Sequence, residues 1–310
     1  MKAAVLPDRG VVKVVGDDAR SFLHGLVTAD VLNLKADEAR YCALLTPQGK
    51  IITDFLAAEA PARDGGGFFL DVPRARIATF IEKLNLYKLR AKVIVEDLSE
   101  ILGVMAVWDG PSLSSPASSG APTQAAKDAI GLCFADPRLP ALGLRIMLPP
   151  HLAAGAAAEF GAALVDAGDY EAHRIALGIP SGGIDFAYGD AFPHEADMDQ
   201  LAGVDFAKGC YVGQEVVSRM EHRGTARSRA VPLRFDGAPP QPGAAIVAGE
   251  RQLGHMGSAA AGRAIALLRL DRVADALARG DALTAGATPV RLVKPDWARF
   301  LFPGDSKAAE

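Results

Sequence analysis

The segment Lys-Gly-Cys-Tyr-Val-Gly-Gln-Glu, residues 208–215, places a thiol, a cation and two glycines within one short stretch. Gly209 and Gly213 permit backbone angles that other residues avoid, so the chain can bend sharply and approach a ligand closely. The QEVVSRM run that follows predicts a helix, and free N–H groups at a helix start favour an anion or a thiolate. Lys208 adds positive charge near Cys210. The thiol could therefore be reactive or metal-competent, or it could be a small residue that fills the bend.

Basic residues are concentrated around this segment. Lys208, Arg219, His222, Arg223, Arg227 and Arg229 fall within 22 residues. Arginine guanidinium groups suit carboxylates and phosphates, although the same pattern also fits a solvated helix face and loop.

An acidic segment, FPHEADMDQL, precedes the thiol and holds His194, Glu195, Asp197 and Asp199. The spacing of these residues matches no standard metal site, so we expect no metal ion here. A carboxylate such as Glu195 could instead hold an amino-pyrimidine edge through two hydrogen bonds.

The composition limits the classes of function. The chain has 310 residues, half of them apolar, which is enough for two or three domains. A net charge of −4 gives no global basic surface for direct nucleic-acid binding. No apolar run approaches the roughly 18 residues that span a bilayer, and the N-terminus MKAAVLPDRG turns polar too soon for a secretory signal. We expect a cytoplasmic monomer without a membrane role.

The three cysteines, Cys42, Cys133 and Cys210, are far apart and form no CxxC pair. That spacing argues against a disulfide framework and a structural zinc site. Cys42 and Cys133 lie in apolar, strand-like runs and are expected to be buried core thiols.

The hydrophobic pattern predicts an α+β, multi-domain fold with mostly antiparallel sheets and packed helices. Residues 1–100 read as a first α+β domain, with a strand at 10–16, a helix capped by Asp17 or Asp18, a hairpin at 41–60 and a helix at 74–90. Part of 170–225 is expected to complete this domain. A second α+β domain at 101–170 contains a loop at 111–127 and a helix from 151 to 168. A central segment at 171–229, a small β-barrel at 230–296 and a tail at 297–310 follow.

The Lys-Gly-Cys-Tyr-x-Gly-Gln-Glu string resembles the signature of the YgfZ family of folate-binding proteins, relatives of the glycine-cleavage T-protein aminomethyltransferases. Other stretches carry the same resemblance: DARSFLHGLVTADV (18–31), LLTPQGKIITDFL (44–56), NLYKLRAKVIVEDLS (85–99), RIALGIPSGGIDF (174–186) and FPHEADMD (192–199). The similarity runs from about residue 10 to about residue 295 and omits the 111–127 loop.

The resemblance implies a central cavity that binds tetrahydrofolate. It also implies a role in maturing or maintaining iron–sulfur enzymes, including enzymes that thiolate tRNA. Folate and iron–sulfur client or assembly proteins are then the expected partners. The matching positions make Cys210 and Asp54 the catalytic candidates and assign Glu195 to the pterin edge. Arg223 would meet the glutamate tail, and the folate-binding set would include Lys208, Tyr211 and Gln214.

The chain departs from the T-protein pattern at two places. T-proteins carry an Asp-Asp pair after the hairpin turn, whereas this chain has Thr53-Asp54, and T-proteins lack the cysteine of the glycine bend. The leading interpretation is that the chain retains the folate pocket but carries out a different chemistry from the T-proteins. A tetrahydrofolate-dependent aminomethyltransferase or demethylase remains the alternative, and a binding module without chemistry is a third.

Overall fold

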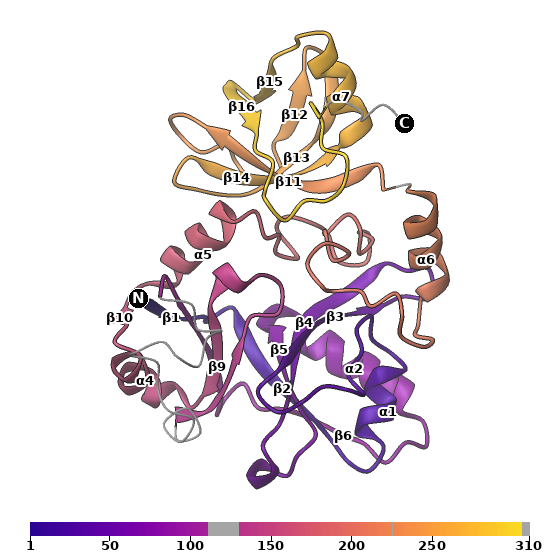
Figure 1. Ribbon diagram of the computed structural model, residues 1–310, viewed down its shortest axis with the longest axis vertical. Coiled ribbons are helices and arrows are strands. Elements are labelled where there is room, and N and C mark those ends of the chain that lie inside the picture. The colour runs from indigo at the N-terminus through magenta and orange to yellow at the C-terminus, as the bar shows by residue number, and fades with distance from the viewer. Residues whose placement is uncertain (111–129, 225, 306–310) are drawn as a thin grey trace. The chain divides into compact units, whose positions relative to one another are not determined.

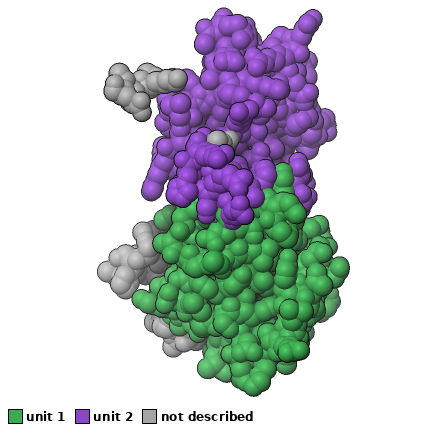
Figure 2. Space-filling model, turned by 90° about the vertical axis from the view of Figure 1, so that its right-hand side faces the viewer, with its two compact units in different colours: residues 1–170, 201–214 green, residues 171–200, 215–310 purple. Residues whose placement is uncertain are grey.

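The computed structural model describes residues 1–110, 130–224 and 226–305 (Figure 1). The chain forms two compact units, which Figure 2 distinguishes by colour. Unit 1 comprises Met1–Tyr170 and Leu201–Gln214, and unit 2 comprises Glu171–Gln200 and Glu215–Glu310. The loop expected at 111–127 and the end of the expected tail lie outside the described residues.

The first sheet of unit 1 is antiparallel throughout. Its order is β3 (Ala39–Leu45), β4 (Ile51–Glu59), β5 (Phe68–Pro73), β2 (Arg9–Val15) and β6 (Ile94–Asp97). The predicted strand at 10–16 and the predicted hairpin are therefore confirmed. The hairpin turn closes where the Thr46 N–H donates to the Lys50 carbonyl at 2.8 Å.

Two helices accompany this sheet, α1 (Ala19–His24) and α2 (Ile77–Lys88). Helix α2 buries Ile77, Phe80 and Leu84, and the Phe80 ring lies 4.8 Å from the Phe55 ring of β4. The cap predicted for α1 is wrong in one respect. Asp18 stands at the N-cap position, but its carboxylate accepts the Lys92 N–H at 2.8 Å rather than a helix N–H.

The second sheet of unit 1 has the order β10 (Ala163–Leu164), β1 (Lys2–Val5), β7 (Gly103–Trp108), β9 (Leu144–Leu148) and β8 (Leu132–Ala135). Only the β1–β10 pair is parallel. Helix α4 (Ala153–Glu159) is shorter than the helix expected from 151 to 168, because Gly161 adopts a φ of +60° and the chain then enters β10.

Unit 2 contains a closed six-stranded barrel, drawn in orange to yellow in Figure 1. Its order is β11 (Ser228–Phe235), β14 (Arg263–Arg269), β13 (Arg251–Ala260), β12 (Ala245–Ala248), β15 (Leu283–Ala285) and β16 (Thr288–Leu292), which pairs back to β11. Three further helices are α5 (Ala167–Ala176), α6 (Gln214–Arg223) and α7 (Leu270–Ala278), and short 3₁₀ turns span Ala62–Asp64, Arg74–Arg76, Pro140–Leu142 and Pro150–Leu152.

The predicted fold class, with antiparallel sheets, packed helices and a small C-terminal barrel, is confirmed. The apolar pattern predicts barrel strands at 231–235, 244–248, 263–270 and 290–294. It misses β13, because two glycines and several polar residues interrupt the alternation of apolar side chains there. A Cβ at Gly254 would lie 2.0 Å from the Leu267 carbonyl oxygen, so this strand requires glycine there. Within the described part of the chain, none of the helices has the length and apolar character needed to cross a membrane.

Phe80 gives a test of the α2 packing. The Phe80→Ala substitution should lower the free energy of unfolding by about 3–5 kcal/mol, because it removes a fully buried ring and leaves a cavity. Leu86→Ala on the same helix is the matched control, since Leu86 is 63% exposed. Urea unfolding of both variants measures the difference, and equal losses would contradict this packing.

Candidate functional site

The loop that carries Cys210 is fastened to unit 1 by a buried lysine. The Lys208 ammonium donates to the His24 carbonyl at 2.6 Å and to the Val27 carbonyl at 2.5 Å. His24 is the last residue of α1, where helix carbonyls lack intrahelical partners and attract a cation. The same ammonium lies 5.1 Å from the centre of the Tyr211 ring.

Burial makes this arrangement costly for a charged amine. Desolvation lowers the pKa of Lys208 from 10.5 to about 8, although the Asp30 and Asp205 carboxylates act in the opposite direction. Burial also raises the pKa of Tyr211 to about 12, with Asp205 adding to the effect. The predicted positive charge of Lys208 is thus directed at two backbone carbonyls.

Asp205 and Thr28 hold the start of the same loop. The Asp205 carboxylate accepts the N–H groups of Ala207 at 2.8 Å and Lys208 at 3.1 Å. The fully buried Thr28 hydroxyl donates to the Gly203 carbonyl at 2.6 Å and accepts the Ala43 N–H of β3 at 2.9 Å. These bonds connect the loop to the first sheet.

The two glycines of the motif have different roles. Gly213 adopts a φ of +83°, and a Cβ there would lie 2.5 Å from the Thr46 carbonyl oxygen. The predicted close approach is therefore made to the β3–β4 hairpin turn. Gly209 lacks a positive φ, and a Cβ on it would meet no described atom within 4 Å. The expectation of special backbone angles at Gly209 is therefore wrong.

Cys210 is the exposed cysteine of the three, while Cys42 and Cys133 are buried as predicted. Burial raises the pKa of the Cys42 thiol to about 12, so this thiol stays protonated at neutral pH. The predicted helix after Cys210 is confirmed as α6, which begins at Gln214. Cys210 is therefore an accessible thiol on a loop that Lys208 anchors.

Asp54 lies on β4, and its side chain is almost fully buried. The Tyr41 hydroxyl donates to the Asp54 carboxylate at 3.0 Å. Burial, followed by the charge of Asp54, raises the pKa of Tyr41 well above its ordinary value. The carboxylate predicted from the hairpin is thus held inside unit 1.

Unit 1 also contains a buried network of charged side chains that the sequence analysis did not predict. Arg145 of β9 lies 3.3 Å from the Asp71 carboxylate of β5 and 3.2 Å from that of Asp136, and it donates to the Tyr170 hydroxyl at 2.9 Å. Burial alone would raise the pKa of Asp136, but Arg138 and Arg145 lower it to about 2. Charged residues inside the apolar runs FFLDVP and LRIML are the signal that could have revealed this connection between the sheets.

Glu195 belongs to unit 2. Its carboxylate accepts the Phe192 N–H at 2.9 Å, and its carbonyl accepts the Ala230 N–H at 2.9 Å. The segment around Glu195 is therefore fixed to β11.

The basic cluster separates into residues with different surroundings. Arg229 is buried and donates to the His194 carbonyl and to the Asp197 and Asp199 carboxylates. The interpretation of the basic cluster as a solvated surface is therefore wrong for this residue. Arg219 pairs with Glu215 at 2.6 Å on the exposed face of α6. Arg223 is exposed at the end of α6.

The structure groups the predicted residues by unit. Unit 1 contains Asp54, Lys208, Cys210, Tyr211 and Gln214, whereas unit 2 contains Glu195 and Arg223. Two hollows in unit 1, of about 610 and 680 Å³, meet at Gly131 and Leu132 and are lined by none of these residues.

Comparison with known proteins first defines the class of fold. The glycine cleavage system aminomethyltransferase T from Bartonella henselae has a similar structure, with a TM-score of 0.71 and 16% sequence identity. The match covers 97% of this chain and 87% of that one. Residues 227–300 match the family described as CAF17, C-terminal beta-barrel domain.

Proteins similar in sequence carry more specific names than the structural neighbour. The chain is 36% identical over 250 residues to the "Iron-sulfur cluster assembly factor IBA57 homolog, mitochondrial" of Mycosarcoma maydis, covering 77% of this chain and 59% of that protein. It is 33% identical over 270 residues to the protein of the same name from Chaetomium globosum, covering 80% and 60%. This chain therefore spans about three fifths of the length of these relatives.

The same comparison overturns one expectation. These relatives, and a third from Coccidioides immitis, are named as mitochondrial proteins. The prediction of a cytoplasmic location is therefore wrong, since the names point to a mitochondrial one.

The lowered pKa of Lys208 gives a pH-dependent prediction. Between about pH 8 and 10.5 the unfolded chain binds the proton that the folded chain has released, so this lysine's contribution to stability rises with pH. Relative to Lys208→Met, the free energy of unfolding of the wild-type chain should increase by on the order of 2 kcal/mol across this range.

Urea unfolding at several pH values, with reduced thiols, measures that difference. Lys35→Met is the control, because Lys35 is an exposed lysine of the same unit. A pH profile of Lys208→Met parallel to that of the wild-type chain would show that the amine is not held in this way.

Proposed function

We propose that the chain is a YgfZ-type, folate-binding accessory protein in iron–sulfur cluster assembly or repair, with Cys210 as its essential thiol. The observation that carries the proposal is the exposed sulfur on a loop anchored by Lys208, in a chain similar to named iron–sulfur assembly factors. The client enzymes under this proposal include those that thiolate tRNA.

The chemistry of a lone thiol limits how it can act. An iron–sulfur cluster takes four protein ligands, so a single thiolate cannot hold one by itself. Cys42 and Cys133 are buried and cannot supply the remaining ligands without unfolding their strands. Cys210 would therefore contribute one ligand to a cluster whose other ligands come from a partner protein.

Folate would be bound by groups of complementary chemistry. Glu195 would accept hydrogen bonds from the pterin edge, and the Phe192 N–H that its carboxylate accepts keeps this side chain in one orientation. Arg223, exposed on α6, would meet the carboxylates of the glutamate tail.

The transferase alternative receives less support. Its motivating residue, Asp54, is buried and accepts the Tyr41 hydroxyl, and the similarity to an aminomethyltransferase at 16% identity concerns the fold alone. The sequence relatives carry the name of an assembly factor.

Complementation tests the role of the thiol. In a host that lacks its own related factor, the wild-type chain should restore aconitase-type and tRNA-thiolating activities, whereas Cys210→Ser should leave them near the empty-vector level. Cys133→Ser is the control, because it changes a buried thiol of similar size. Full restoration by Cys210→Ser would remove the thiol from the proposal.

Titration with tetrahydrofolate tests the ligand separately. Glu195→Ala should weaken binding by roughly tenfold to a hundredfold, because hydrogen bonds to a charged group contribute about 1.5–3 kcal/mol. Cys210→Ser should bind almost normally, and so should Glu215→Ala, which removes an exposed carboxylate of α6. Unchanged binding by Glu195→Ala would contradict this assignment.

A further inference from the structure

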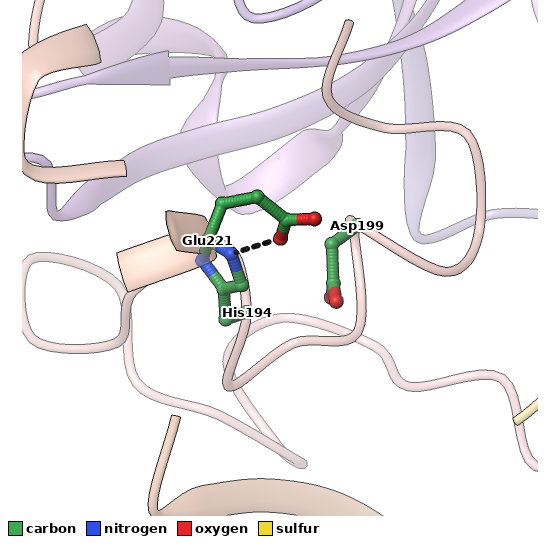
Figure 3. A group of neighbouring side chains, drawn as sticks. All are labelled: His194, Asp199 and Glu221. Atoms are coloured by element: carbon green, nitrogen blue, oxygen red, sulfur yellow. Dashed lines mark hydrogen bonds and ion pairs between the residues drawn. The ribbon is translucent and has the colours of Figure 1, made fainter. Parts of the chain in front are cut away.

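Unit 2 brings two side chains of the acidic segment together with one from α6. His194 and Asp199 come from the irregular acidic segment and Glu221 comes from α6, as Figure 3 shows. One ligand atom from each lies within 4.8 Å of the others. The acidic segment alone lacks the spacing of a metal site, whereas the fold adds Glu221 of α6, 22 residues beyond Asp199.

The central pair has the separation that a metal ion requires. The His194 Nε2 atom and the Glu221 carboxylate lie 3.0 Å apart. With bonds of roughly 2.1 Å, adjacent ligands of an octahedral or tetrahedral ion lie about 2.9–3.4 Å apart. A cation can therefore take the place of the proton that now lies between these two atoms.

Asp199 retains one coordination position. An ionised carboxylate offers about four lone-pair sites. Arg229 occupies one on each oxygen, at 2.9 and 2.8 Å, and the Gln200 amide occupies another on Oδ2 at 2.6 Å. The remaining site lies on Oδ1, and Arg229 fixes its direction, as hydrogen bonds to metal-binding carboxylates commonly do.

The fit requires a small movement. Opposite ligands of an octahedral ion lie about 4.2 Å apart, so the group is at most about 0.6 Å too wide. Glu221 can supply this movement, because its side chain is 44% exposed, whereas those of His194 and Asp199 are almost fully buried.

A second observation comes from Asp197, two residues before Asp199. Its Oδ1 atom accepts the same Arg229 Nη1 group at 3.0 Å, and its fully buried Oδ2 has no hydrogen-bond partner among the described residues. A φ of +54° holds this residue in the left-handed conformation that residues other than glycine rarely adopt. A cation bound in this segment would give that buried oxygen a partner.

We propose that His194, Asp199 and Glu221 bind a divalent transition-metal ion. One imidazole nitrogen with carboxylate oxygens suits Zn²⁺, Fe²⁺ or Mn²⁺ better than Ca²⁺ or Mg²⁺, which prefer oxygen alone. In the octahedral arrangement that fits this separation, three protein ligands leave the other positions open to water or another ligand. The site is independent of the thiol of Cys210 and of the proposed function.

Zn²⁺ titration by calorimetry tests the site on the full chain, with Cys210→Ser as the background so that the exposed thiol cannot bind the metal. One Zn²⁺ should bind with a reproducible dissociation constant. Glu221→Gln should weaken binding at least about tenfold, since it removes a ligand charge. Glu215→Gln, which changes another acid of the same helix, should leave the constant unchanged.

His194→Gln provides a second variant, and thermal unfolding of each protein confirms that it remains folded. A folded His194→Gln variant should also lose at least about tenfold in affinity. Absence of saturable Zn²⁺ binding by the background protein would overturn the proposal. So would binding that Glu221→Gln and His194→Gln leave unchanged.

Discussion

The buried ammonium of Lys208 is the interaction on which the thiol loop depends. It donates to two backbone carbonyls, at the end of α1 and three residues beyond it. Desolvation penalises the charge, as its lowered pKa records, so only a fixed geometry can retain it. The Thr28 hydroxyl supplies part of that geometry by joining the loop to β3, and the Asp205 carboxylate holds the loop itself through the Ala207 and Lys208 N–H groups.

The Cys210 loop is anchored through Lys208, whereas its sulfur is exposed, and these two properties complement each other. Under the proposed function the thiol has to be accessible to a partner's cluster, yet its position must not vary between encounters. Gly213 supports this, because its close approach to the hairpin turn directs the chain from the loop into α6. The charged amine of Lys208 therefore helps to position Cys210, because its hydrogen bonds go to the His24 and Val27 carbonyls.

Arg229 organises unit 2 in a comparable way. One guanidinium group contacts a carbonyl and two carboxylates, and it lies 4.4 Å from the centre of the Phe300 ring. Burial raises the pKa of Asp197 well above its ordinary range despite this arginine, while hydrogen bonds from Arg229 lower that of Asp199. The acidic segment is thereby held against β11 beside Glu221.

The sequence by itself determined the antiparallel sheets, the hairpin, the helix α6 and the two buried thiols, because each follows from local periodicity or turn residues. It did not reveal β13, whose Gly254 is required by the close approach of the neighbouring strand β14. The tertiary structure alone decided that Lys208 contacts a carbonyl 184 residues away and that Glu221 joins His194. Such pairings depend on which distant backbone groups and charges burial leaves to be satisfied, and no local pattern encodes that.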